Sequence, residues 1–326
     1  MKFSPIYISV LLAEISALFL TLKSLDFPEY VRVFDSFKFN SPYPSTEYLF
    51  WIIFDGLSAT NLPYNIIIFF IFNITLFVKI ISLVKLSNRP DWSSIFIYIA
   101  TYFLLHECTR LRVACGLSFS LFSCYFLLNG RYFFAFILTC LSSSFHLTAP
   151  LLTIFFFLCF SSLIFQKSAI AFCMIGVTTF ALKLSIIFPI ISSGMMLLGG
   201  RYIDYTNRLI HQGQNKSGLA FIYAFGVLII LVALKFWAHR NPNKLPPAFH
   251  PLLATSIYGV GIIFWFYETV AIGSRLSDVL LITIVPVISI FIANTSLLYK
   301  TLVYFCLVLF FLARVYQLFP FVFNFT

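Results

Sequence analysis

Residues Tyr64–Val84 read YNIIIFFIFNITLFVKIISLV, an apolar run that contains a single charged residue, Lys79. An α-helix rises about 1.5 Å per residue, so a run of this length can cross the roughly 30 Å hydrocarbon core of a bilayer. In lipid, a helix also satisfies every backbone hydrogen-bonding group within the segment itself. The stretch therefore predicts a transmembrane helix.

The same pattern recurs along the chain. Of 326 residues, 61% are hydrophobic, 20% are aromatic and only 10% are charged, which is too few charges for the surface of a soluble domain. We expect an all-α polytopic membrane protein, one integral membrane domain over residues 1–326, with about 11 spans and a range of roughly 9–12. The other predicted spans are Ile6–Leu22, Ser93–Leu105, Val113–Leu128, Tyr132–Ser144, Ala149–Phe165, Ala169–Pro189, Gly218–Leu234, Pro251–Tyr267, Val279–Ile292 and Leu302–Phe319.

The uncharged stretch 132–166 is too long for one crossing, and we expect it to bend at Ser142–His146, just before Pro150. His146 would then lie at a membrane face. The seven cysteines have neither the spacing nor the histidine partners of a metal site, so no metal is expected.

With the amino terminus in the cytoplasm, the connections between spans fall into two sets that differ in charge type. Seven of the ten inner cations are Lys, whereas seven of the ten outer cations are Arg, and nine of the 11 acids are also outer. The planar fork of Arg suits phosphate groups, so the outer face resembles a site of chemistry. The net charge of +10 is not arranged as a basic stripe on a soluble domain, and nucleic-acid binding is not expected.

Two outer loops, 23–63 and 191–217, are long enough to fold over such a site. The first contains Thr46–Phe54, an aromatic segment that we expect to lie in the membrane interface as a short helix. Glu47 within it has apolar neighbours that could raise its proton affinity for a role as a base. The alternative is an ordinary solvated acid.

Two further patches carry side chains suited to anions and protons. Arg110 and Arg112 stand at the start of a predicted helix, where a pyrophosphate would be favoured, although both could instead reach lipid headgroups. His146 can exchange protons near neutral pH, or simply be hydrogen-bonded within a helix bundle. Near the end of the chain, Arg275 and Asp278 are three residues apart and could serve a site, form a local pair, or both.

Several short motifs follow one another along the chain. They are, in order, Asp26 with Tyr30 and Phe34, Glu47 among aromatics, Leu111-Arg112-x-Ala114, Phe145-His146, Arg201 with Tyr205, Arg275-Leu276-Ser277-Asp278 and Pro286. In this order they resemble the EpsG type of Wzy polymerases over roughly residues 20–295. The chain departs from the family pattern at Val113 and Cys115, and Thr46-Glu47-Tyr48 stands where Glu-Pro is usual.

The resemblance implies a glycosyltransferase with a GT-C-like fold in the bacterial inner membrane, its active site facing the periplasm. It would transfer a glycan from undecaprenyl pyrophosphate to the non-reducing end of a lipid-linked repeat unit, as in O-antigen synthesis, without a cofactor. Its partners would be these undecaprenyl-linked oligosaccharides, membrane lipid and a chain-length regulator. The resemblance implies Arg112 and Arg275, with Arg110 and Arg201, for the pyrophosphate. Either Glu47 is the base and His146 an orienting or leaving-group contact, or the two roles are exchanged. The residues implied for the sugars are Tyr202, Tyr205, Asp278 and Trp51, although the aromatic residues suit a membrane-interface belt equally well.

Two other classes of membrane protein are alternatives. A flippase or transporter of lipid-linked oligosaccharides would need cations near the bilayer midplane, whereas here only Glu14 and Lys183 are predicted well inside spans. A membrane acyltransferase that modifies polysaccharide would be expected to place its Arg and His motifs in the first spans. Neither pattern matches this chain.

Overall fold

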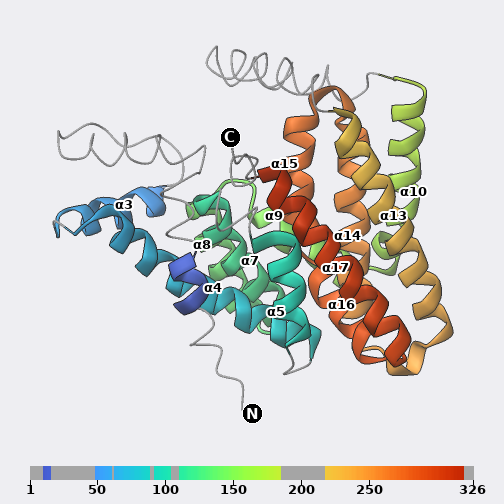
Figure 1. The fold of residues 1–326 in the computed structure, drawn as a ribbon, viewed down its shortest axis with the longest axis horizontal. Helices are drawn as coiled ribbons and strands as arrows, with labels where there is room; N and C mark the ends of the chain where they lie inside the picture. Colours follow the sequence, from blue (N-terminus) through green and yellow to red (C-terminus); the bar gives the residue numbers. More distant parts are fainter. Residues whose placement is uncertain are drawn as a thin grey trace. The chain divides into compact units, whose positions relative to one another are not determined.

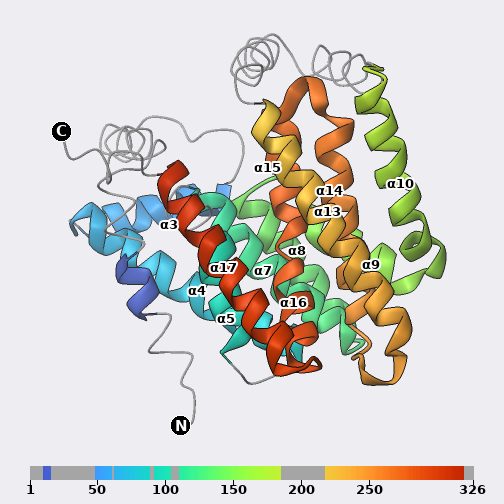
Figure 2. The same cartoon turned by 45° about the vertical axis from the view of Figure 1, so that its right-hand side comes forward.

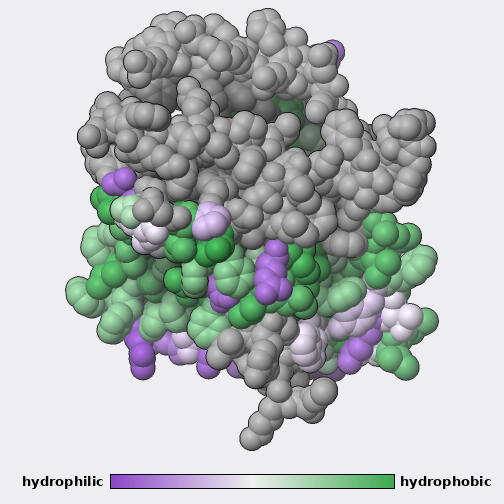
Figure 3. All heavy atoms as spheres, turned by 60° about the vertical axis from the view of Figure 1, so that its left-hand side comes forward, coloured by the Kyte–Doolittle hydropathy of each residue, from purple (hydrophilic) through white to green (hydrophobic). Residues whose placement is uncertain are grey.

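The computed structural model describes residues 10–15, 48–60, 62–88, 92–103, 110–184 and 217–318. All regular structure within these ranges is helical. Five helices in the described part are long and apolar enough to cross a membrane, and five shorter helices are also apolar. Figure 3 shows that the visible surface of the described residues is mainly hydrophobic. The chain is therefore a helical membrane protein, while the count of eleven spans remains a prediction.

The helices group into two compact units, and the first comprises residues 1–154 and 285–326. It contains α3 (Tyr48–Ser58), α4 (Tyr64–Ser87), α5 (Ser93–Tyr98) with the π-helical turn η1 (Ile99–Phe103), α7 (Leu111–Leu128), α8 (Tyr132–Phe145), the start of α9 (Pro150–Ser161), nearly all of α16 (Ile284–Ala293), and α17 (Leu297–Leu318).

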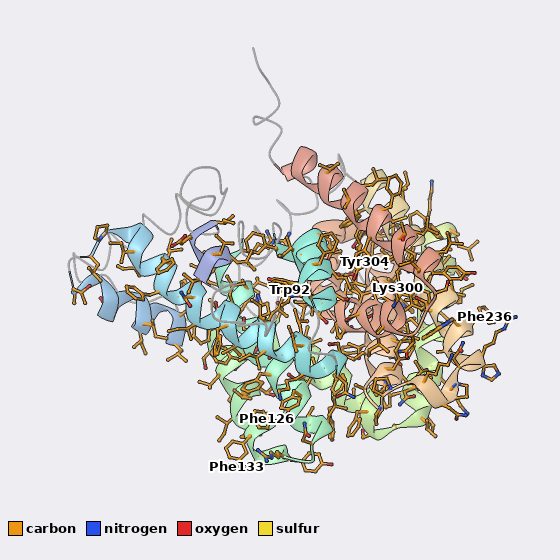
Figure 4. The ribbon with its side chains drawn as sticks, turned by 60° about the horizontal axis from the view of Figure 1, so that its bottom comes forward. Trp92, Phe126, Phe133, Phe236, Lys300 and Tyr304 are labelled. Carbon is orange, nitrogen blue, oxygen red and sulfur yellow. The ribbon has the colours of Figure 1, made fainter. Side chains whose placement is uncertain are left out.

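Helices α7 and α8 form an antiparallel hairpin, visible in Figure 1. The Gly130 N–H donates to the Leu127 carbonyl at 3.1 Å, and the Arg131 N–H donates to the Phe126 carbonyl at 3.0 Å. Gly130 adopts φ +68°, a left-handed conformation that glycine accepts without steric cost. Phe126 and Phe133, labelled in Figure 4, lie near this turn. The start of α7 and the end of α8 consequently lie together at the opposite end of the hairpin.

Helix α5 is tied by side chains to three other helices of this unit. Tyr304 lies near the start of α5, close to Trp92 in Figure 4, and its ring packs edge-on against Phe96. Such hydroxyl contacts hold short helices that lack a large apolar interface. The hydrogen bonds are Lys79 to Tyr98 (3.3 Å, α4), Ser94 to Ser289 (2.9 Å, α16) and Ser93 with Tyr304 (2.9 Å, α17).

The second unit, residues 155–284, is built around α14 (Phe249–Trp265). Residues 251–264 of α14 are all buried because α10, α13 and α15 pack on it, as Figure 2 shows. The Trp265 indole donates to the Phe172 carbonyl at 3.1 Å. The remaining elements are the end of α9, α10 (Leu163–Ala181), α13 (Ser217–Arg240), η2 (Pro242–Lys244), η3 (Tyr267–Thr269) and α15 (Val270–Leu281).

Several predicted elements are confirmed and others are wrong in detail. The bend before Pro150 is confirmed, since α8 ends at Phe145, and a helix is present at α3. The predicted span 149–165 is interrupted at Ser162, because a turn within an apolar run leaves no charge signal. The predicted span 279–292 lies within the stretch Ile272–Ala293, which is long and apolar enough to cross a membrane, and a short turn divides this stretch into α15 and α16. Lys183 was predicted inside a span, but it follows the end of α10 and is exposed.

Candidate functional site

The predicted site residues divide between the two units and the parts outside the described residues. Arg110, Arg112 and His146 belong to the first unit, and Arg275 and Asp278 belong to the second. Trp51 lies on α3, although the placement of its side chain is not described. Glu47, Arg201, Tyr202 and Tyr205 lie outside the described residues.

The two arginines of the first unit stand at the start of α7. Arg110 is the residue before the first helical turn, its carbonyl accepts the Ala114 N–H at 3.0 Å, and Arg112 is the second residue of the helix. Both side chains are half-buried. The first turn of a helix leaves backbone N–H groups unpaired within the helix and carries a partial positive charge, which adds to the two guanidinium groups. This end of α7 is therefore electropositive and suited to an anion.

His146 ends α8 in an extended conformation, φ −157° and ψ 127°. It begins a tight turn in which the Ala149 N–H donates to the His146 carbonyl at 3.1 Å. Its ring folds over that turn, so that Nδ1 lies 3.3 Å from the Thr148 backbone nitrogen and 2.9 Å from Thr148 Oγ1. Pro150 then starts α9, a position where its missing N–H costs nothing. The segment from His146 to Pro150 thus fixes the ring through its own backbone.

Helix α7 holds this turn through one face. Gly116 lies so close to the turn that a Cβ there would stand 2.7 Å from the Ala149 Cβ and 3.4 Å from the His146 Cβ. One helical turn further along, the Ser120 hydroxyl donates to the Ala149 carbonyl at 2.7 Å and pairs with Ser142 Oγ, also at 2.7 Å.

The spacing of these residues puts Arg112 one helical turn before Gly116, which contacts the histidine turn. Arg112, Gly116 and Ser120 are four residues apart in succession and share one face of α7. Arg112 is one helical turn outside the Gly116 contact, on the face that meets His146. The structure thus brings Arg112 and His146 to the same end of the α7–α8 hairpin.

Helix α3 packs against α8 of the same unit. Its residue Phe50 is only 1% exposed, so an aromatic anchor holds the helix. This helix begins one residue after Glu47.

In the second unit, the connection before α15 and the helix itself carry the other charged candidates. The Tyr267 hydroxyl donates to Glu268 Oε1 at 3.4 Å. On α15, Arg275 is exposed, whereas Asp278 is 9% exposed. Ser277 between them is fully buried, and its hydroxyl has no hydrogen-bond partner among the described residues.

Sequence reasoning missed the residues that hold the site together. Gly116, Ser120 and Ser142 shape the α7–α8 contact, and Thr148 orients His146. The four-residue spacing from Arg112 to Gly116 and Ser120 was a usable signal, since small residues at that interval mark close helix contacts in membranes. Lys79, the single charged residue of the predicted span Tyr64–Val84, is fully buried within α4.

Comparison with known proteins gives one match. The model of the EpsG family matches residues 5–323, nearly the whole chain. None of the curated proteins matches the chain, and no solved structure matches it, so the GT-C likeness remains a prediction. At the level of the family, the match fits a polysaccharide-polymerase role and a glycosyltransferase-like activity. The chain belongs to the EpsG family.

Proposed function

We propose that this protein is a polysaccharide polymerase of the Wzy type in the bacterial inner membrane. It transfers a glycan from undecaprenyl pyrophosphate to the non-reducing-end sugar of a lipid-linked repeat unit, on the periplasmic face. The observation that supports the proposal is that the start of α7, which holds Arg112, and the end of α8, which holds His146, lie at the same end of the hairpin. Family membership supports the reaction class.

The chemistry requires cations where the leaving group departs. As the bond from the anomeric carbon to the phosphate oxygen breaks, the pyrophosphate takes the bonding electrons and its negative charge grows. Guanidinium groups already in place stabilise that charge more in the transition state than in the ground state. In the proposal, Arg112 and Arg275 hold the pyrophosphate, with Arg110 and Arg201 assisting.

The acceptor requires a base and a sugar-binding surface. Its hydroxyl oxygen bonds to the anomeric carbon and loses its proton, and the proposed bases are Glu47 and His146. Tyr202, Tyr205, Trp51 and Asp278 are proposed to face the sugars, because aromatic faces and carboxylates contact sugar rings and hydroxyls. The donor is already activated by its pyrophosphate, so the scheme requires no cofactor.

The test compares Arg112→Ala, His146→Ala and Arg275→Ala with Arg131→Ala in separate strains. Arg131 is an exposed arginine at the opposite end of the same hairpin, which makes it a matched control. The first three variants should lose the lipopolysaccharide ladder and leave single repeat units on lipid A. The amount of polymer should fall by about 100-fold or more, as it does when other transition-state hydrogen-bond donors are removed. Arg131→Ala should keep the ladder.

Protein levels measured on immunoblots exclude trivial loss of the enzyme. Intact ladders in all three variants at normal levels would refute the proposed site. The other functions give different phenotypes on deletion of the gene: a flippase leaves no surface repeat, and an acyltransferase leaves normal chain lengths without the ester.

A further inference from the structure

The hydrogen bonds around His146 determine which ring nitrogen carries the proton. A neutral imidazole has one protonated nitrogen and one acceptor nitrogen. The Thr148 backbone N–H, a donor that cannot rotate away, points at Nδ1 from 3.3 Å. A hydrogen on Nδ1 would face this donor, so Nδ1 must be the acceptor and Nε2 must carry the hydrogen.

The Thr148 hydroxyl is compatible with the same assignment and can add a second hydrogen bond to it. Its Oγ1 lies 2.9 Å from Nδ1, and a hydroxyl hydrogen rotates to donate wherever an acceptor is in reach. Two donors from one residue therefore converge on Nδ1. The arrangement is a side-chain analogue of the turns in which Asn or Asp accepts the N–H two residues later. It is local to His146-Leu147-Thr148 and is set by the turn that the Ala149 N–H closes.

We propose that Thr148 is a positioning residue that holds His146 with its hydrogen on Nε2, so that His146 serves the site as a hydrogen-bond donor and not as the base. This inference rests on the proposed function and decides between the two roles left open for His146. Nδ1 is engaged by Thr148, and Nε2 already bears a hydrogen, so neither nitrogen is poised to take the acceptor proton. The base is then a different group, for which Glu47 is the candidate.

A donor at Nε2 suits the leaving group. The developing negative charge on the pyrophosphate oxygens accepts hydrogen bonds, and the Arg112 guanidinium stands at the same end of the hairpin. His146 and Arg112 would bind the same anion, and the Nε2 hydrogen remains on the ring throughout the transfer. The chemical class recognised is a phosphate ester oxygen.

The first experiment reads the tautomer without any assay of activity. Protein carrying ¹³C,¹⁵N-labelled histidine is placed in lipid vesicles and studied by solid-state NMR, and the His146 signals among the five histidines are identified by their loss in His146→Asn. We expect a hydrogen on Nε2 and an unprotonated Nδ1. Thr148→Val should raise the Nδ1–H fraction, and Thr148→Ser should restore the wild-type spectrum.

An Nδ1–H form in the wild-type protein would overturn the proposal, and so would a Thr148→Val spectrum that does not differ from wild type. Failure of Thr148→Val to fold leaves the wild-type spectrum as the deciding measurement.

The second experiment separates a donor from a base. The amide of His146→Gln reaches the position of Nε2 and donates there, whereas the amide of His146→Asn reaches only the position of Nδ1 and preserves the turn. A donor role predicts at least about tenfold more polymer with Gln than with Asn. Equal loss in both variants would overturn the donor role.

The two proposals can fail separately. Normal ladders in His146→Gln and His146→Asn would remove His146 from the polymerase site and would refute the donor role. The NMR result on Thr148 and the tautomer would remain valid in that case.

Discussion

Gly116 and Ala149 approach each other so closely that a methyl group at position 116 would stand 2.7 Å from the Ala149 Cβ. The Ser142 carbonyl oxygen would lie at 3.2 Å from the same methyl. Both neighbours are rigid, because one is a Cβ attached directly to the backbone and the other is a backbone atom. The absence of a side chain at position 116 therefore sets the distance between α7 and the turn that carries His146.

Gly116→Ala should force the histidine turn away from α7. Overpacking of this kind costs roughly 1–3 kcal/mol of stability, and the displacement of His146 from Arg112 should reduce polymer further. Apparent unfolding temperature in detergent and the polysaccharide ladder measure the two effects.

Gly226→Ala is the matched control, since nothing lies within 4 Å of a Cβ at that helical glycine. This substitution should leave stability unchanged or raise it by up to about 1 kcal/mol, because alanine has a higher helix propensity than glycine. Equal behaviour of the two variants would contradict the close-contact argument.

Ser120→Ala should loosen the same turn without a clash. The Ser120 hydroxyl is buried and bonds the Ala149 carbonyl and Ser142 Oγ, each at 2.7 Å, so its loss leaves two buried polar groups short of a partner. The expected cost is about 1–3 kcal/mol, read from unfolding in detergent. Ser161→Ala is the comparison, because that exposed hydroxyl bonds only carbonyls of its own helix, and a similar loss there would argue against a special role for Ser120.

The apolar runs of the sequence predicted the positions of the helices along the chain better than they predicted the packing between helices. The long run containing α4 and the break between Phe145 and Pro150 were both predicted, because hydrophobic length and proline are local signals. In a membrane, however, hydropathy does not separate a lipid-facing side from a packed side. On α8 the exposed residues Phe133 and Phe136 are apolar, while Ala135 is buried.

The charged residues of the candidate site could be predicted from the sequence, but the residues that hold them in position could not. Arg112 and His146 stand out as rare polar residues at span ends. Their position at one end of the hairpin depends on Gly116 and Ser120, which contact residues about 30 positions away in the chain, such as Ala149. No local pattern specifies which partner a small residue will meet, so these contacts emerged only from the folded hairpin.

Ser277→Ala tests whether the Ser277 hydroxyl contributes to stability or to function. The hydroxyl is buried without a partner among the described residues, so its removal should leave stability unchanged or raise it by up to about 1–3 kcal/mol, the penalty of an unsatisfied group. Ser256→Ala in the same unit should be destabilising, because Ser256 Oγ and Thr283 Oγ1 are 2.7 Å apart.

Polymer length supplies the second readout for Ser277. A stable Ser277→Ala protein with normal ladders would leave the hydroxyl without a role. A stable protein with shortened ladders would add it to Arg275 and Asp278 as a proposed substrate contact. A clear loss of stability would contradict the structural assignment.

Lys79 and Tyr98 form a buried pair between α4 and α5, and the pair should be energetically coupled. Lys79 is fully buried, and its Nζ donates to the Tyr98 hydroxyl at 3.3 Å while lying 5.5 Å from the ring centroid. A cation inside a membrane bundle is costly unless polar groups surround it. Tyr98→Phe keeps the ring but removes the acceptor, which should cost roughly 1.5–3 kcal/mol for a bond to a charged group.

The coupling is measured by a double-mutant cycle with Lys79→Met, which removes the charge and keeps the length of the side chain. In the Lys79→Met background, Tyr98→Phe should cost much less, since the hydroxyl no longer serves a cation. Tyr304→Phe is the control, because its bond to Ser93 does not involve Lys79 and its effect should be the same in both backgrounds to within about 0.5 kcal/mol. If Tyr98→Phe costs as much in the Lys79→Met background as it does beside the lysine, the ammonium does not depend on that hydroxyl, and other groups must hold the charge within α4.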